Sequence, residues 1–260
     1  MAGLHVSVSQ VKCYLRCPRQ YQLKYVLGVA PAFLPAALAF GTAVHAALAS
    51  HYHALQAGSP RSLEELVTVF RDAWANASAG PVPLQAEDDA DSDVVDRGVA
   101  MLRAFHAQAP AAHVEVEDVE RSFSVELHDP DSGEVIEERL VGAFDLVVRE
   151  AGRAIVVEHK TAARKWTDDQ LRYDFQVTAY RFAARLLGLG DVGLRLQILT
   201  KTKSPTVHVE DIERDDHAED DFLRTVIGVL RAIDAGAFYP IRGWQCKGCQ
   251  VAHACVGGGP

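Results

Sequence analysis

The hydrophobic pattern of this chain changes period near residue 113, and this change limits the fold more than any other feature. Before it, apolar residues recur at helical spacing over several segments. After it, Val114–Leu127 and Val135–Val148 alternate as strands do, and they flank a DPDSG turn, which predicts a β-hairpin. A chain that begins with helices and continues into paired strands is expected to be an α/β protein.

Further elements are expected on both sides of the hairpin. Ser7 and Gln10 form a capping-box pattern that predicts the start of a first helix, and Ser62 with Glu65 repeats it. The stretch that begins at Ala79 mixes Pro, Gly and acidic residues and is expected to be a mobile loop. The expected helices cover about residues 8–27, 36–55, 62–77, 94–107 and 168–187 and a last segment that ends near 235, and the expected short strands cover 154–157, 194–199 and 206–209.

Together these elements predict one α/β domain with a central mixed sheet flanked by helices. Residues 7–110 are expected to form a mainly helical part, residues 113–235 the core, and residues 236–260 a cysteine-rich tail that closes on Cys17. At 260 residues and 48% hydrophobic composition, the chain can bury a full core as one large domain or two small ones.

The composition limits the possible function classes. The net charge of −9 argues against a protein whose whole surface grips a phosphate backbone, although it leaves room for a local basic groove. An excess of carboxylates is also what a metal-binding site needs. No apolar run approaches the length that spans a bilayer, and the N-terminus lacks the pattern of a signal peptide, so we expect a cytoplasmic protein without a membrane partner.

Two carboxylates and a lysine are expected to meet on neighbouring strands. Asp145 lies in the second strand of the hairpin, and Glu158 and Lys160 follow the next run of buried-type residues. Because side chains two positions apart point to the same face of a strand, Glu158 and Lys160 share a face and His159 is turned away. Two close carboxylates repel each other unless a cation lies between them, which predicts a divalent metal. The adjacent lysine would stabilise phosphate charge or orient an attacking water.

The structural alternative is that these acids are solvated charges on an exposed sheet face. Alone, an Asp followed by Glu-x-Lys is a weak signal. The placement favours a site, because Glu158 and Lys160 end the buried-type run Ala154–Val157 instead of alternating with other polar groups.

Four cysteines near the two ends of the chain fit one metal centre. The tail carries Cys246, Cys249 and Cys255 as C-x2-C-x5-C, in which the C-x2-C pair chelates without backbone strain. Cys17, which precedes a proline, supplies a fourth thiolate. The alternatives are a zinc ribbon, which usually needs a second C-x2-C knuckle that this chain lacks, and unligated buried thiols. Cys13 is the spare cysteine, one helical turn from Cys17.

Asp145, Glu158 and Lys160 are spaced as D-x12-E-x-K, which resembles the motif of the PD-(D/E)XK nuclease superfamily. The resemblance implies a restriction-endonuclease-like core and metal-dependent hydrolysis of phosphodiester bonds in DNA. The position of Glu158 is often Asp in RecB-type members, although the superfamily pattern allows Glu. This departure leaves the metal geometry open and the assignment intact.

Three further segments resemble the RecB-type branch. FGTAVHAAL places His45 on a helix after a glycine, which resembles the helical metal-binding histidine of that branch. QVTAY places Gln176 and Tyr180 on one helical face, which resembles its Q-x3-Y motif beside the DNA. SVSQVKCYLRCPRQYQLKYVLGV resembles its N-terminal segment. Without these companions, His45 would by default be a core or surface histidine, and Gln176 with Tyr180 a helix-face pair packed on the sheet.

The resemblance implies a role for each active-site residue. Four groups would bind Mg²⁺ or Mn²⁺: Asp145, Glu158, His45 and the backbone carbonyl of His159. Lys160 would position or activate the attacking water. Gln176 and Tyr180 would orient the DNA strand or the lysine.

The cysteine layout resembles that of iron–sulfur nucleases, namely the AddB-type nuclease domain and the CRISPR-associated single-strand exonucleases. In those proteins four thiolates hold a 4Fe-4S cluster that ties the chain ends together. The resemblance implies the same cluster here, held by Cys17, Cys246, Cys249 and Cys255. It also implies exonucleolytic trimming of single-stranded DNA.

The expected partner is DNA that is single-stranded or has single-stranded ends. The residues expected to contact it are Arg16, Arg19, Arg164, Lys165 and Tyr180, and the alternative for each charge is a solvated surface position. A helicase partner would place the chain in DNA repair and an integrase partner in CRISPR spacer acquisition; phage replication is a third setting.

A second hypothesis is a non-catalytic DNA-end-binding or adaptor subunit, stapled by a four-cysteine cluster or zinc site. The intact set of Asp145, Glu158 and Lys160 argues against it, because a degraded site would normally lose one of them. A third hypothesis, a zinc-dependent nucleic-acid-binding protein, differs from the others in its metal.

Overall fold

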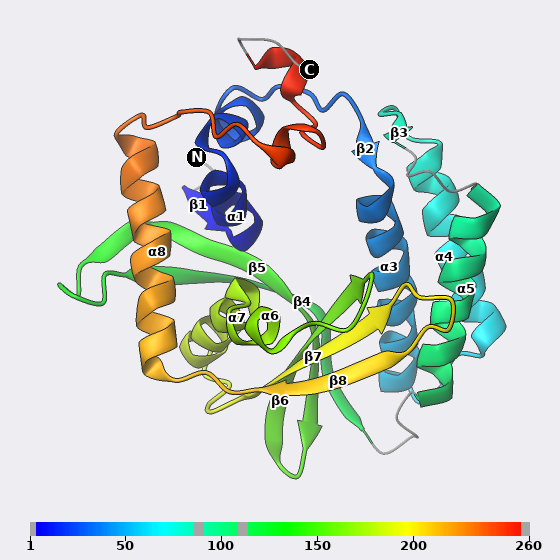
Figure 1. Cartoon of the computed structure of the whole chain (residues 1–260). Coiled ribbons are helices and arrows are strands. Elements are labelled where there is room, and N and C mark those ends of the chain that lie inside the picture. Colours follow the sequence, from blue (N-terminus) through cyan, green and yellow to red (C-terminus); the bar gives the residue numbers. More distant parts are fainter. Residues whose placement is uncertain (1–3, 86–90, 109–113, 256–260) are drawn as a thin grey trace. The chain divides into compact units, whose positions relative to one another are not determined.

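The computed structural model describes residues 4–85, 91–108 and 114–255 (Figure 1). The chain divides into two compact units, each built from separate stretches of sequence. The terminal unit consists of Met1–Leu34, Phe123–Gly142 and Asp215–Pro260, and the central unit of Pro35–Ser122 and Ala143–Arg214. The predicted partition of one domain into helical part, core and clasp stays a prediction.

A mixed sheet runs through the central unit. The hairpin strands β4 (Glu115–His128) and β5 (Val135–Glu150) contribute to both units, and the strands β6 (Arg153–Ala162), β7 (Gly193–Thr200) and β8 (Val207–Ile212) belong to the central unit. β4 pairs with β5; β5 and β6 are antiparallel, β6 and β7 parallel, and β7 and β8 antiparallel. The predicted hairpin and mixed sheet are therefore confirmed. β6 continues past its predicted end at Val157, so Glu158 and Lys160 lie within a strand.

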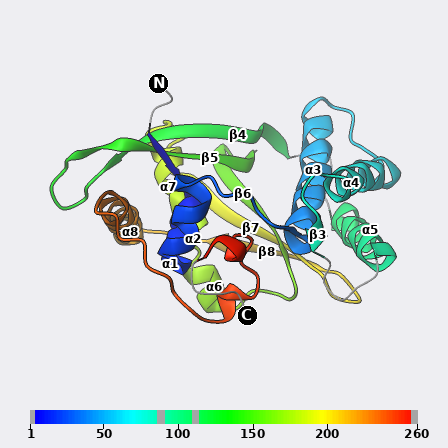
Figure 2. The ribbon, with the colours of Figure 1, turned by 90° about the horizontal axis from the view of Figure 1, so that it is seen from above.

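Three helices of the central unit pack side by side: α3 (Ala36–Gln56), α4 (Leu63–Ser78) and α5 (Asp91–Gln108) (Figures 1 and 2). Ser62 and Glu65 form the predicted capping box at the start of α4. Gly98 permits α4 and α5 to approach closely, because a Cβ there would come within 2.1 Å of the Phe70 ring. The predicted loop after Ala79 lies partly outside the described residues, and α5 begins ahead of its predicted start at Val94.

The predicted helix over 168–187 is wrong, since the chain forms two helices there. α6 (Asp168–Arg172) ends, and α7 (Phe175–Leu186) begins after Asp174. The Asp174 carboxylate accepts hydrogen bonds from the backbone N–H groups of Gln176 and Val177, both at 3.0 Å. This N-cap satisfies the free donors of the first turn and fixes where α7 starts.

In the terminal unit, the short strand β1 (His5–Ser7) pairs in parallel with β5, with Val6 opposite Leu140. The predicted helix over 8–27 is interrupted, and three segments follow instead: α1 (Val8–Arg16), α2 (Pro18–Tyr21) and the π-helical segment η1 (Gln22–Val26). The break falls at Cys17, whose backbone is extended because the ring of the following Pro18 disfavours a helical conformation there. The capping box of Ser7 and Gln10 is confirmed.

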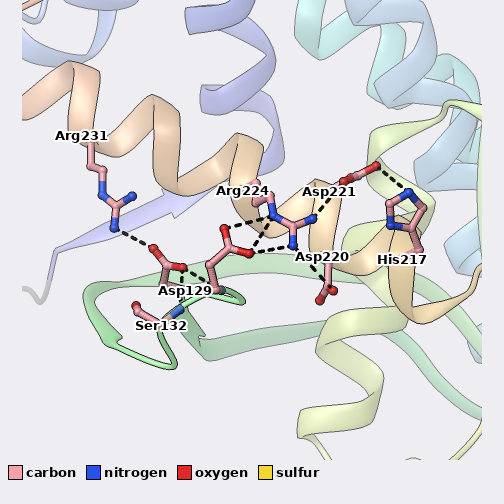
Figure 3. A network of polar contacts seen from close by, with 8 residues as sticks. Asp129, Ser132, His217, Asp220, Asp221, Arg224 and Arg231 are labelled. Atoms are coloured by element: carbon pink, nitrogen blue, oxygen red, sulfur yellow. Dashed lines mark hydrogen bonds and ion pairs between the residues drawn. The ribbon is translucent and has the colours of Figure 1, made fainter.

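Helix α8 (Asp216–Asp234) holds the hairpin turn of the terminal unit through ion pairs (Figure 3). Arg231 lies 2.7 Å from Asp129, and Arg224 lies 2.8 Å from Asp131. Asp129 also accepts hydrogen bonds from two backbone N–H groups of its own turn. The remaining elements are the two-residue strands β2 (Leu34–Pro35) and β3 (Leu84–Gln85) and the 3-10 turns η2 (Trp244–Cys246) and η3 (Ala252–Ala254).

The core of the central unit consists of large apolar side chains from the sheet and from α7. Phe144, Leu146, Leu196 and Phe182 are all fully buried. Among the described residues, no helix combines the length and the apolar character that crossing a bilayer requires.

Candidate active site

Asp145 and Glu158 meet on neighbouring strands of the central unit. The register of β5 and β6 extends to the pair of Leu146 with Val157, and Asp145 and Glu158 are the residues that come directly after this pair on the two strands. The backbone N–H of His159 donates a hydrogen bond to Asp145 Oδ2 at 2.8 Å. Glu158 is only 2% exposed, so it is a buried acid and not a solvated surface charge.

Lys160, Gln176, Tyr180 and Glu158 form a closed ring of hydrogen bonds, which we call the lysine ring. Lys160 Nζ donates to Glu158 Oε1 and, at 2.9 Å, to Gln176 Oε1. Gln176 Nε2 donates to the Tyr180 hydroxyl at 2.9 Å, and that hydroxyl lies 2.7 Å from Glu158 Oε2. The ring explains the spacing of QVTAY, because positions four apart on α7 place both polar groups over the strand that carries Glu158 and Lys160.

His45 reaches the same acids from helix α3. Its Nδ1 atom lies 3.5 Å from Asp145 Oδ2, and its ring forms a hydrogen bond with the backbone of His159. One turn earlier, a Cβ on Gly41 would lie 3.5 Å from the Thr161 side chain, so α3 passes close to β6 at this level. The structure thus brings together His45, Asp145 and the backbone of His159, and their binding of a metal stays a prediction.

Glu120 is an acid of this site that the sequence did not single out. Ligand atoms of His45, Glu120 and Asp145 all lie within 4.8 Å of one another, a spacing at which three groups can hold one metal ion. Glu120 has a φ of 52°, a left-handed conformation that is unusual for a residue other than glycine. The carboxylate of Glu158 is engaged by Lys160 and Tyr180 and is not part of this group of three.

Asp145, Glu120 and Glu158 lie so close together that they cannot all be negatively charged at neutral pH unless a cation lies between them. Burial, followed by the negative charge of Glu158, raises the pKa of Asp145 to about 8. Partial removal from water and the same charge raise the pKa of Glu120. Burial lowers the pKa of His45, so its imidazole is neutral and available as a ligand at neutral pH.

Lys160 and Tyr180 are held in their protonated forms. Burial alone would lower the pKa of Lys160, but the charge and hydrogen bond of Glu158 outweigh it and raise that pKa. Burial, then the charges of Glu158 and Asp145, raise the pKa of Tyr180 well above its usual value. At neutral pH the lysine ring therefore contains an ammonium group and a hydroxyl group, both hydrogen-bond donors.

The side chain of His159 points into the protein, as strand alternation predicts. Its ring stacks on Tyr52, with ring centroids 5.6 Å apart and an angle of 11° between the planes. Burial lowers the pKa of His159 to about 3, so the ring stays neutral. Only the backbone of this residue faces the acids, which is the contribution that was predicted for it.

The basic residues expected to contact DNA fall into both units. Arg164 and Lys165 follow β6 and are exposed, and Lys165 forms an ion pair of 2.7 Å with Glu210. Arg16 is exposed at the end of α1, and Arg19 hydrogen-bonds to Gln22. Their contact with DNA stays a prediction.

Four cysteines line one cavity of about 640 Å³ in the terminal unit: Cys17, Cys246, Cys249 and Cys255. The backbone N–H of Ile241 lies 3.5 Å from Cys17 Sγ, so the tail lies against the loop between α1 and α2. Cys13 is buried in α1 and does not line the cavity. In the described part of the chain, no three cysteine sulfurs lie within 4.8 Å of one another.

Comparison with known proteins agrees with this geometry. A family model of the PD-(D/E)XK nuclease superfamily matches residues 5–256. The chain belongs to this superfamily. No curated protein matches the chain.

Solved structures similar to this PD-(D/E)XK nuclease share little sequence identity with it. The crystal structure of a protein from Eubacterium rectale named "Putative exonuclease" aligns with a TM-score of 0.58 and 16% identity, over 98% of this chain and 90% of that one. The crystal structure of SSO0001 aligns with a TM-score of 0.39 and 14% identity, over 92% of this chain and 94% of that one. The first likeness supports the fold, and the second is too distant to carry an inference.

Proposed function

We propose that this PD-(D/E)XK nuclease hydrolyses phosphodiester bonds in DNA and trims single-stranded ends, in a reaction that needs Mg²⁺ or Mn²⁺. The observation that carries the proposal is the half-buried Asp145 beside the buried Glu158 and the half-buried Lys160 on neighbouring strands. Buried acids that repel each other are the arrangement that a divalent ion relieves. The name of the Eubacterium rectale protein supports the same class of activity.

The donor set fits a hard divalent cation. Carboxylate and carbonyl oxygens are the ligands that suit Mg²⁺ and Mn²⁺, and His45 adds a neutral nitrogen. We assign Asp145, His45 and the backbone carbonyl of His159 as ligands, with Glu120 as a further ligand. Glu158 would bind through lone pairs that its hydrogen bonds to Lys160 and Tyr180 leave unused. When bound, the ion would supply positive charge to the scissile phosphate and favour deprotonation of the attacking water.

Lys160 acts as a cation in the proposed reaction. Its pKa is raised, so the amine is an ammonium group that can donate hydrogen bonds to the attacking water and to a phosphate oxygen. During hydrolysis the water oxygen forms a bond to phosphorus, and the bond from phosphorus to the leaving deoxyribose oxygen breaks. The leaving oxygen then takes up a proton. Charge builds up on the phosphate oxygens as these bonds change, and the ammonium group stabilises that charge.

Gln176 and Tyr180 act on Lys160 and Glu158 in this proposal, and not on the DNA. Both of their polar groups are already used within the lysine ring, at distances between 2.7 and 2.9 Å. A lysine fixed in this way loses less side-chain freedom when the transition state forms. We therefore assign these two residues a positioning role.

We further propose that Cys17, Cys246, Cys249 and Cys255 hold a 4Fe-4S cluster. All four line one cavity, although they come from opposite ends of the chain. A zinc site of four thiolates usually uses two C-x2-C knuckles, whereas this chain has one, Cys246 with Cys249. Four thiolates that include one C-x2-C pair suit a cluster, in which each thiolate binds a different iron.

Such an enzyme needs a source of single-stranded ends and a use for trimmed ones. A helicase would expose single strands as its product, and an integrase would consume trimmed ends as its substrate. We propose a partner of one of these two classes.

The test is cleavage of an end-labelled single-stranded oligonucleotide by the purified chain. We expect shortening with Mg²⁺ or Mn²⁺ and none with EDTA, no cleavage of a circular single strand, and slower cleavage of a blunt duplex. Cleavage of the circular strand would show that the enzyme is an endonuclease and not an exonuclease. Tight binding of the strand without cleavage under any metal condition would instead support the adaptor subunit.

A further inference from the structure

Both ends of the chain are free of acidic residues, in a protein whose net charge is −9. No Asp or Glu precedes Glu64, and none follows Asp234. The parts of these segments that belong to the terminal unit carry six lysines and arginines: Lys12, Arg16, Arg19, Lys24, Arg242 and Lys247. An excess of positive over negative charge within these two segments favours a polyanion over a neutral or basic partner.

The two acid-free segments lie together in space, which makes them one surface. The backbone N–H of Arg19 donates to the Tyr239 carbonyl at 3.1 Å, and that of Ala32 donates to the Gln250 carbonyl at 2.8 Å. Ile241 contacts the Cys17 sulfur. Figures 1 and 2 both show the tail beside α1 and α2. We call this surface, formed by residues 12–32 and 239–250, the terminal basic surface.

Most carboxylates of helix α8 lie away from this surface, whereas Asp234 ends the helix where the tail begins, and Glu138 of β5 lies near enough to act on Tyr21. Four of the five acids of α8 fall in its first two turns, Asp216 to Asp221, whereas the tail leaves from the other end of the helix. At 1.5 Å per residue, about 20 Å of helix separates Asp221 from the end of α8. Several of these acids and those of the hairpin turn are also paired with Arg224 and Arg231 (Figure 3).

Trp244 is the most exposed large apolar side chain of the described residues, at 85% exposed. By contrast, Trp74 is 4% exposed and packs against Phe40. Arg242 and Lys247, on either side of Trp244, are also exposed, and Tyr239 is 57% exposed. A single exposed apolar residue needs no explanation, but an exposed indole that lies between two cations in an acid-free segment has the chemistry that binds unpaired bases and phosphates together.

We infer that the terminal basic surface binds single-stranded DNA, with Trp244 stacked on a base and Arg242, Lys247 and Arg16 beside the phosphates. The inference rests on the proposed function for the identity of the nucleic acid, and it adds a binding site outside the lysine ring and the metal ligands. Stacking needs a base that is not already paired, so this surface favours single strands over blunt duplexes. It supplies a physical reason for the proposed preference for single-stranded ends.

The test measures binding without cleavage, in the full chain with EDTA present. A dye-labelled oligothymidylate is titrated with protein and its fluorescence anisotropy gives Kd. We expect Trp244→Ala to raise Kd by about 5- to 150-fold, the range for loss of one stacked base, and Trp244→Phe to raise it less. Binding to a blunt duplex should change little. The matched control is Trp74→Phe, a buried tryptophan of α4 that cannot stack on a base, which should leave Kd unchanged.

Two further readouts separate stacking from indirect effects. Arg242→Gln and Lys247→Gln should each reduce the dependence of log Kd on log salt, by about one released counterion, whereas Arg103→Gln on α5 should not. The iron or zinc content of Trp244→Ala should equal that of the wild type, since Cys246 lies only two residues away.

An unchanged Kd in Trp244→Ala would overturn the inference. So would a loss of bound metal together with the loss of binding, and so would a tryptophan-dependent self-association in place of DNA binding. If the wild type binds strands through Trp244 but never cleaves them, the proposed nuclease fails while this inference stands. If it cleaves and the substitution leaves Kd unchanged, the reverse holds.

Discussion

The ammonium group of Lys160 lies 2.9 Å from the side-chain oxygen of Gln176, and this contact joins strand β6 to helix α7. Glu158 and Tyr180 complete the lysine ring on the other side. Asp174 caps α7 and fixes the residue at which this helix begins. The start of the helix determines where the Gln176 side chain lies relative to Lys160. The position of the Lys160 ammonium group therefore depends on where α7 starts.

We predict that Gln176→Ala lowers kcat by up to about 100-fold while the KM for a single-stranded oligonucleotide stays within twofold. The reason is that Lys160 loses its neutral partner and the ring opens. Steady-state kinetics at saturating Mn²⁺ give both constants. The control is Gln108→Ala, an exposed glutamine at the end of α5. A raised KM with an unchanged kcat would show that Gln176 contacts DNA instead.

We predict that Glu120→Gln raises the Mn²⁺ concentration for half-maximal cleavage by about 10- to 100-fold. The substitution removes one negative charge from the group formed by His45, Glu120 and Asp145, and it keeps the size of the side chain. Because Glu120 is exposed, the melting temperature without metal should change little. Glu115→Gln, an exposed acid of the same strand, should leave the metal dependence as it is. Equal metal dependence in both variants would exclude Glu120 as a ligand.

We predict that the metal-free protein loses stability between about pH 4 and pH 8 through Asp145. Its pKa is about 8 in the folded protein and about 3.9 in an unfolded chain. In that window the folded state binds the extra proton, so the free energy of unfolding falls as the pH rises. The lowered pKa of His45 makes the free energy of unfolding rise with pH instead. The quantity to compare is therefore the difference in the free energy of unfolding between the wild type and Asp145→Asn at each pH.

Urea unfolding in EDTA across that range gives this difference. The free energy of unfolding of the wild type should fall with pH relative to that of Asp145→Asn, and it should level off above pH 8. Saturating Mn²⁺ should remove the fall, because a bound cation favours the charged carboxylate. Parallel curves for the two proteins without metal would contradict the raised pKa of Asp145.

We predict that Cys246→Ser removes the metal centre of the terminal unit and that Cys13→Ser does not. Anaerobically purified wild type should be brown, with about four irons per chain. A centre shared by Cys17 and Cys246 closes nearly the whole chain into a loop, so its loss should destabilise the protein by up to about 5 kcal/mol. Limited proteolysis should then cut the tail after Gly236. Zinc in place of iron would refute the cluster and leave the four-cysteine site standing.

Much of the fold and of the site could be predicted because local signals agreed with the tertiary structure. Two capping boxes marked helix starts, and alternation marked the hairpin strands. The pattern D-x12-E-x-K predicted that Asp145 and Glu158 lie close together. The prediction was possible because a tight turn between two antiparallel strands fixes which residues face each other. The helical spacing of Gln176 and Tyr180 likewise fixed a shared face.

The breaks in two predicted helices, the role of Glu120 and the strand β1 were not predicted from the sequence. Pro18 disfavours a helical Cys17, and Asp174 is a good N-cap, so both helix breaks had a local signal that the continuous apolar spacing outweighed. No local sequence signal marked Glu120 as part of the site. Its left-handed conformation within a strand is held by the surrounding structure. The three residues of β1 are too few to show a period.

The most direct test of the proposed active site is single-turnover cleavage of an end-labelled single strand by wild type and by Lys160→Ala, with Mn²⁺ present. The wild type should shorten the strand, and the variant should show no cleavage above background while its Kd for the strand in EDTA stays within a few-fold. Cleavage by Lys160→Ala at the wild-type rate would contradict the assignment of this site.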